Sequence, residues 1–370
     1  MTGNPTLVAV RARRAIGAGG VAQAGERLNP EGRFEYDRDT PHQAYTLAFP
    51  LELGGKRARR IDLAEAAMRT TEAEIAQLVA DTRNDVRRAY FDRAAAEARL
   101  ALLDDLQTIT ARARDAARAR FEAGSAPRLE QLQAELALAQ QQNETTGARG
   151  TLAAARTRFN ALLGVPLDTV NTLATADVLI PITFEVAIAR ARSDSAELAL
   201  IDRRIEEQKA KVALAKAMQS IDLTPEGSVT HGFGADSEFN TGWKAAVAFS
   251  IPIFTTHKAG VAIEESTLAQ LTAARAAADT RITGAVSAAI TIADALRQQY
   301  VRYRDEILPQ AIQVETMADD AYRLGQTGIA AYLQALQATR EVRLRSLQAE
   351  ADLLAALADL EQAMGAPLQP

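Results

Sequence analysis

The chain contains few side chains whose type and spacing suit catalysis or metal binding. It has 370 residues and no cysteine, which excludes thiolate nucleophiles, thiolate metal sites and disulfides. Its three histidines, His42, His231 and His257, are far apart in the sequence and lack partners at metal-ligand spacing. No serine–histidine–acid or paired-carboxylate arrangement can be assembled from the spacing. We therefore expect no enzyme activity, no cofactor and no metal site.

One glycine-rich, basic stretch is the other candidate for chemistry. Gly54-Gly55-Lys56 resembles the end of a phosphate-binding loop, but the upstream glycine is missing and Arg57 stands where serine or threonine is needed. The run Lys56-Arg57-Ala58-Arg59-Arg60 has two interpretations, the solvated start of a helix or a contact with lipid headgroups. The net charge of −5 argues against a nucleic-acid partner.

Long helices are the elements that must hold any functional residues in place. Helical patterns are predicted over 56–123 and 258–324, each followed by a returning helix, over 126–163 and 328–364. At about 1.5 Å per residue each long helix measures roughly 100 Å, too long for a compact domain. Pro309 predicts a kink or local break in the second one. Shorter helices, 5–27 and 196–220, precede them, and the whole indicates an antiparallel helical rod.

The same order of elements occurs twice. Phe49-Pro50-Leu51 recurs as Ile251-Pro252-Ile253, and the glycine turn at Gly124 recurs at Gly325, each about 200 residues later. An internal repeat of this kind sets the architecture of the whole chain. We predict a first repeat over 1–164, a strap over 165–194 and a second repeat over 195–370.

Four short segments alternate apolar and polar residues, which is typical of strands. They cover about 33–37, 43–53, 227–234 and 241–254. The sheet either packs its apolar face on the helices or turns that face to lipid. Four strands cannot close a membrane barrel, whereas three chains supply twelve. The side chains expected to face lipid are Tyr45, Leu47, Phe49, Trp243, Val247, Phe249 and Ile251, and the strand–helix junctions contain Pro50, Gly54, Gly55 and Pro252.

The termini and apolar runs limit the membrane interpretation. No run of about 18 apolar residues is present, so no transmembrane helix is expected. Met1 to Pro5 show no basic stretch followed by an apolar core, and therefore predict no signal peptide.

In their order, spacing and duplication, these features resemble the outer-membrane efflux protein family, the TolC-like proteins. The resemblance covers essentially the whole chain and rests on Asn4-Pro5-Thr6-Leu7, the junction from Phe49 to Arg57, its counterpart from Phe249 to Phe254, the two glycine turns and Ala161-Leu162-Leu163-Gly164. The segment from Leu51 to Arg57 is most similar to the branch that serves heavy-metal exporters of the cobalt-zinc-cadmium type.

The resemblance implies a mainly helical fold with a small β part. Three chains would form a twelve-stranded barrel in the outer membrane above a periplasmic α-helical tunnel. It also implies the passive exit duct of a tripartite efflux pump, with heavy-metal cations among the expected cargo. Its partners would be two further copies of the chain, outer-membrane lipid, a periplasmic adaptor (membrane fusion) protein and an inner-membrane transporter of the RND or ABC type. Neither covalent chemistry nor nucleic acid is expected.

The family's functional positions map onto the helix turns. The resemblance implies an adaptor-docking tip at Gly124, Ser125, Leu324, Gly325 and Gln326, and an entrance constriction at Glu130, Ala331 and Gln334. Glu130 has a second interpretation, an acid placed in the first turn of a helix by the helix dipole. The second acidic ring of the family is missing, because its positions hold alanine and glutamine.

One alternative belongs to a different class of protein. The chain is then a soluble coiled-coil scaffold with a small β-tip, an interpretation that the missing signal peptide favours.

Overall fold

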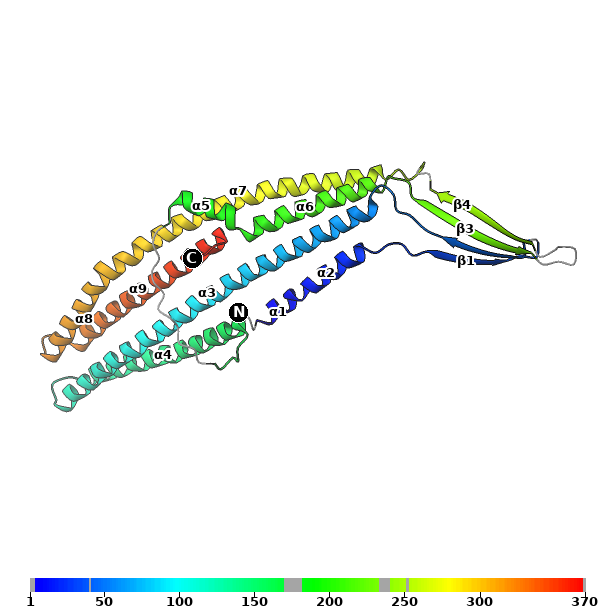
Figure 1. Cartoon of the computed structure of the whole chain (residues 1–370). Helices are drawn as coiled ribbons and strands as arrows, with labels where there is room; N and C mark the ends of the chain where they lie inside the picture. Colours follow the sequence, from blue (N-terminus) through cyan, green and yellow to red (C-terminus); the bar gives the residue numbers. More distant parts are fainter. Residues whose placement is uncertain (1–3, 40, 170–181, 233–239, 251–252, 369–370) are drawn as a thin grey trace. The chain divides into compact units, whose positions relative to one another are not determined.

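A computed structural model describes residues 4–39, 41–169, 182–232, 240–250 and 253–368. The chain is mainly helical with one four-stranded antiparallel sheet (Figure 1), which confirms the predicted fold class. It divides into two compact units, a helical unit of residues 1–8, 78–195 and 280–370, and a sheet unit of residues 9–77 and 196–279. Each unit takes residues from both halves of the chain, so the division into sequence repeats stays a prediction.

The sheet of the sheet unit is built from two hairpins. Its strands are β1 (Glu31–Tyr36), β2 (Gln43–Ala48), β3 (Leu223–Gly232) and β4 (Asn240–Phe249), in the spatial order β1-β2-β3-β4. Strands β2 and β3, far apart in sequence, pair directly through residues such as Tyr45 and Val229. The predicted strand over 43–53 was too long. Its ladder ends at Ala48, after which the Phe49 amide still donates to the Pro225 carbonyl and one isolated bridge joins Leu51 to Leu223.

The helices of the sheet unit directly precede or follow its strands in the sequence. They are α2 (Arg13–Ala24), the first part of α3 (Lys56–Glu122), α6 (Ala196–Ala217) and the first part of α7 (Lys258–Arg302). A single helix was predicted over 5–27. The structure has two helices there, α1 (Pro5–Arg11) and α2, which are separated at Ala12. Small buried side chains, among them Ala66 and Val212, let these helices approach closely.

The helical unit contains two helical hairpins. The end of α3 returns as α4 (Arg128–Leu163), and α7 continues through a π-helical turn, η1 (Tyr303–Ile307), into α8 (Leu308–Arg323), which returns as α9 (Ile329–Met364). Their shared core includes Ala117, Ala134, Tyr322 and Ile329, each almost fully buried. These side chains come from α3, α4, α8 and α9, so the core joins the two hairpins.

The local break expected at Pro309 is confirmed as the π-helical turn η1. The proline ring clashes with the carbonyl group four residues earlier, which is that of Asp305. A π-turn widens the backbone at that position and lets the helix continue. The outgoing helix of the second hairpin therefore has an internal irregularity, whereas α3 runs without one.

Buried polar groups hold the segments that follow α4 and α9. The Asn160 side chain donates hydrogen bonds to the carbonyl oxygens of Leu167 and Thr169. Glu361 accepts a hydrogen bond from the Leu368 amide at 2.7 Å and forms an ion pair with Arg87. In the predicted strap, residues 184–194 form helix α5 (Phe184–Asp194), which packs on α9. Residues 170–181 of the strap lie outside the described residues.

Candidate functional site

The sheet separates apolar and polar side chains onto opposite faces. Phe34, Tyr45, Val229 and Trp243 form one row across all four strands, since each is paired with the next. All four are exposed, and Trp243 reaches 83% exposure. The neighbouring row on the other face is Arg33, Thr46, Ser228 and Lys244. The alternation is that of a sheet between an apolar and a polar medium.

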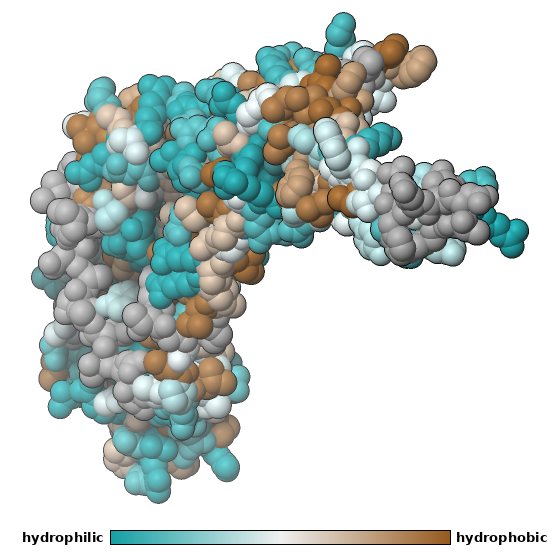
Figure 2. Space-filling view, turned by 45° about the vertical axis from the view of Figure 1, so that its right-hand side comes forward, coloured by the Kyte–Doolittle hydropathy of each residue, from teal (hydrophilic) through white to brown (hydrophobic). Residues whose placement is uncertain are grey.

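The residues expected to face lipid lie on this exposed apolar face. Tyr45, Leu47, Phe49, Trp243, Val247 and Phe249 are all exposed, whereas Ile251 and the junction residue Pro252 lie outside the described residues. A cap that packs on its own helices would bury these side chains. The space-filling view also shows hydrophobic residues in patches on the surface (Figure 2). An apolar face of this size marks contact with lipid or with another protein surface.

The junction from β2 to α3 is a tight structural clamp. Gly54 and Gly55 have φ angles of 67° and 74°. A Cβ atom at Gly54 would lie 2.0 Å from the Ser220 Oγ. Glycine is therefore required there both because a side chain has no space and because the backbone is left-handed. The Lys56 ammonium, 6% exposed, donates to the Asp222 carboxylate at 2.6 Å and to the Ser220 carbonyl at 2.9 Å.

Asp222 completes this clamp from just before β3. Burial alone raises the pKa of its carboxyl group, but the hydrogen bonds from Lys56 and the Leu53 amide outweigh burial and leave the pKa below its ordinary value. The carboxylate therefore stays charged at neutral pH. The arrangement holds two chain segments together and offers no phosphate-binding loop.

Most cations of the basic run have partners inside the protein. The Arg57 guanidinium donates to the Gly25 carbonyl at 2.8 Å, and Arg60 donates to the carbonyls of Ala24 and Glu26. These carbonyls end α2, where positive charge is favoured by the helix dipole. The outermost cation, Arg59, pairs with Asp62 at 3.2 Å. The run is mainly a helix-capping device, which neither of its two sequence interpretations included.

The two glycine turns of the helical unit have the same geometry. Gly124 and Gly325 have φ angles of 71° and 72°, and the space around a Cβ atom is open at both. In each turn the next residue, Ser125 or Gln326, donates its amide to a carbonyl in the last turn of the helix. With Leu324, 72% exposed, they form an exposed surface. The structure thus presents all five predicted tip residues to solvent, and their role in docking stays a prediction.

An aromatic pair lies behind these turns. Tyr322 and Tyr332 stack with ring centroids 5.0 Å apart, and the Arg120 guanidinium lies 4.8 Å from the Tyr322 ring. The Tyr332 hydroxyl donates to Asp319 at 2.7 Å. Burial, followed by this hydrogen bond, raises the pKa of Tyr332 well above its ordinary value. Sequence analysis missed this pair, although the tyrosines are at the start and end of the second turn.

Glu130 has a different environment from the other two predicted constriction residues. It lies in the first turn of α4 and is half-buried, and its Oε2 atom is buried without a hydrogen-bond partner among the described residues. Ala331 and Gln334 are exposed on α9. A Cβ atom at Gly328 would lie 3.9 Å from the Glu130 Oε1, which places this carboxylate beside the start of the second returning helix. The constriction itself stays a prediction.

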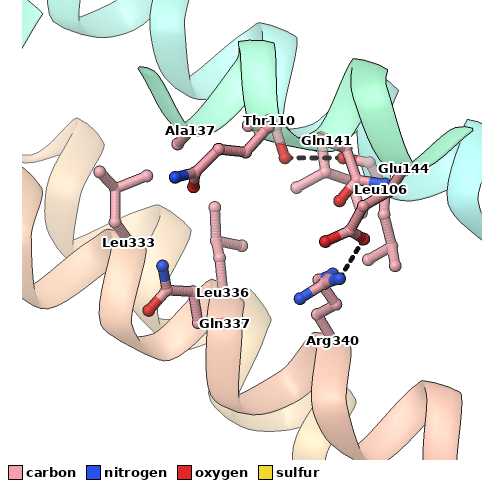
Figure 3. A pocket seen from close by; sticks show the side chains of 11 residues that line it. Leu106, Thr110, Ala137, Gln141, Glu144, Leu333, Leu336, Gln337 and Arg340 are labelled. Carbon is pink, nitrogen blue, oxygen red and sulfur yellow. Dashed lines mark hydrogen bonds and ion pairs between the residues drawn. The ribbon is translucent and has the colours of Figure 1, made fainter. Parts of the chain in front are cut away.

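A small pocket lies between α3, α4 and α9 (Figure 3). Its volume is about 70 Å³, and an ion pair between Glu144 and Arg340 crosses one end. Ligand sites usually measure about 300–1,000 Å³, so this pocket is too small for a cargo molecule. Nearby, Arg343 forms ion pairs with Asp105 at 2.9 Å and Glu315 at 3.0 Å. The pocket region therefore contains ties between the two hairpins.

Clusters of metal ligands and membrane-spanning helices are both absent from the described parts of the chain. Within them, no group of three or more histidine, aspartate or glutamate side chains could hold a metal ion. The His231 Nδ1 atom is hydrogen-bonded to the Thr241 hydroxyl at 2.9 Å. None of the helices there combines the length and apolar character that crossing a membrane requires.

Comparisons with known proteins connect these features. Residues 2–165 match the sequence model of the outer membrane efflux protein family. A cobalt-zinc-cadmium resistance protein, CzcC of Cupriavidus metallidurans, is 27% identical over 259 residues, which make up 68% of this chain and 61% of that relative. The matching part thus spans less than two thirds of the relative's length.

The fold is shared over almost the whole chain. The outer-membrane channel OprN superposes with a TM-score of 0.80 and 18% identity, covering 100% of this chain and 88% of OprN. The outer membrane protein VceC of Vibrio cholerae gives a TM-score of 0.78 and 16% identity, covering 99% of this chain and 94% of VceC. The first 165 residues thus match the outer membrane efflux protein family, and the whole chain shares the fold of these outer-membrane channels.

Proposed function

We propose that three copies of the chain form an outer-membrane exit duct. The observation that carries this proposal is the exposed apolar row Phe34–Tyr45–Val229–Trp243 on a sheet with two open edges. With four consecutive antiparallel strands, β4 runs antiparallel to β1. The edge β4 of one copy is therefore compatible with antiparallel pairing to the edge β1 of the next. Three copies supply twelve strands, above the minimum of about eight for a barrel.

In this proposal the helices continue the duct into the periplasm. The helical unit supplies two hairpins per chain, and their exposed glycine turns dock a periplasmic adaptor, which connects the duct to an inner-membrane transporter of the RND or ABC type. The duct conducts passively, with no catalytic step. Glu130, Ala331 and Gln334 would lie at its entrance, with Glu130 as the acidic member of the three.

Heavy-metal cations are the proposed cargo. The support is the likeness to a relative described as a cobalt-zinc-cadmium resistance protein. A duct needs no tight metal site for this cargo, because conduction requires that binding be weak enough for release.

The mass of the purified chain in detergent and in plain buffer tests the proposal. Light scattering should give a trimer in detergent and aggregation without it, since the apolar sheet face then has no apolar surroundings. A stable monomer or dimer in plain buffer would favour the alternative, a soluble scaffold with a β-tip.

A further inference from the structure

A groove of about 620 Å³ lies in the sheet unit, where the segment after α2 meets the junction from β2 to α3. It is nearly ten times the volume of the pocket in the helical unit and falls within the range of ligand sites. None of the residues that line the groove lies in a strand. The chemistry of the groove is therefore determined by the segments that connect α2 to β1 and β2 to α3, and by the start of α3.

One wall of the groove is apolar and continues the exposed sheet face. Leu28, Phe49, Leu51 and Leu53 line it, and all four are exposed. Phe49, Leu51 and Leu53 keep the alternation that places Tyr45 and Leu47 on the apolar face. A hydrocarbon chain that covers the sheet face can therefore extend along this wall without crossing a polar surface.

The other part of the lining is positively charged. Arg57 lines the groove while bound to the Gly25 carbonyl. Arg27 also lines it, is exposed, and forms no hydrogen bond or ion pair with any residue that the structure describes. The acidic residue of the lining, Glu52, is paired with Arg60 at 2.6 Å. Arg27 is thus a cation without a counter-charge beside an apolar wall.

We propose that this groove binds an anionic phospholipid, with the headgroup phosphate at Arg27 and Arg57 and an acyl chain along the apolar wall. Arginine recognises phosphate through paired N–H donors, and its stem packs on hydrocarbon. A free phosphate ion would match the cations but leave the leucine and phenylalanine side chains exposed. The proposal rests on the membrane location argued above.

Native mass spectrometry of the delipidated full chain in detergent tests the groove, with phosphatidylglycerol and phosphatidylcholine as probes. Wild type should retain phosphatidylglycerol preferentially. Arg27→Gln should weaken its binding about fivefold, the effect of one cation at a membrane surface. Arg27→Lys should restore part of the binding. The matched control is Arg59→Gln, which removes a cation of the same region that is paired with Asp62 and outside the groove lining.

Unchanged phosphatidylglycerol binding in Arg27→Gln, or equal losses in both glutamine variants, would overturn the proposal. Glycerol phosphate bound as tightly as the whole lipid would also overturn it, because the apolar wall would then contribute nothing.

A second measurement distinguishes failure of the groove from failure of the proposed function. It uses Trp243, the single tryptophan of the chain. Quenching of Trp243 by brominated-chain lipids in vesicles supports the membrane barrel even if the groove fails, and its absence contradicts the barrel.

Discussion

Apolar side chains have opposite surroundings in the two units. In the helical unit, Tyr322 is 1% exposed and packs in a core shared by four helices. In the sheet unit, Trp243 is 83% exposed at the β4 end of an apolar row. The difference shows that the helical unit completes its core within one chain, whereas the sheet needs another apolar medium or partner to cover its face.

The largest expected effect comes from the core of the helical unit. Tyr322→Ala should lower the free energy of unfolding by about 3–5 kcal/mol, because it removes a buried aromatic ring stacked on Tyr332. Trp243→Ala is the matched control and should cost much less in detergent. Urea unfolding followed by circular dichroism measures both. Equal losses would show that the tryptophan is also part of a core.

A charge on the exposed sheet face gives the next largest effect. Val247→Arg should cost about 2–4 kcal/mol if this face meets the bilayer midplane. Ala246→Arg places the same charge on the opposite face, beside Glu226, and should cost much less. The yield of folded protein in lipid vesicles measures the difference. Equal insertion of both variants would contradict the contrast between the two sheet faces.

The two neighbouring glycines of the β2–α3 junction sharpen the comparison within the sheet unit. Both have positive φ angles, so alanine strains the backbone at either position. Only Gly54→Ala also drives a Cβ atom onto Ser220, which should cost about 1–3 kcal/mol beyond Gly55→Ala. Thermal unfolding of the two variants tests this. A larger loss in Gly55→Ala would contradict the geometry of the clamp.

Acid should weaken the same clamp by the smallest amount. The folded-state pKa of Asp222 lies below its unfolded value of 3.8, so its stabilising contribution is present above that pH and is lost as pH falls through the folded pKa. The carboxylate is about half exposed, so the loss should stay below about 1 kcal/mol.

Asp222→Asn should remove this part of the pH dependence, as followed by denaturant unfolding between pH 5 and pH 2. Glu26→Gln, which removes an exposed acid of the same unit, serves as the control. An unchanged acid profile in Asp222→Asn would mean that other carboxyl groups determine it.

Local patterns predicted most of the elements because their causes are local. Alternation in residues 43–49 and 241–249 marks strands, glycines at 124 and 325 end helices, and Pro309 disrupts one. The end of the second strand, at Ala48, was less accurate, since it depends on pairing with residues far away in the sequence, and the helix break at Ala12 was missed.

For the functional sites, too, features with local causes could be predicted and features that depend on distant segments could not. The exposed apolar face follows from strand periodicity alone, whereas the role of the basic run does not. Arg57 and Arg60 cap α2 only because the chain folds its carbonyl end beside the start of α3. The free cation, Arg27, lies outside the run and is recognised only once the groove is formed.

The long helices, the four strands, the side chains on each sheet face and the positions of the turns could be predicted from local patterns in the sequence. These depend on periodicities of 3.6 and 2.0 residues and on the backbone preferences of glycine and proline, which are properties of neighbouring residues. The tertiary contacts were needed to show that β2 pairs with β3, that Lys56 is buried against Asp222, that Tyr322 stacks on Tyr332 and that Arg27 pairs with none of the described residues. Each of these depends on which distant segments meet, and burial and pairing are set by that meeting rather than by residue type.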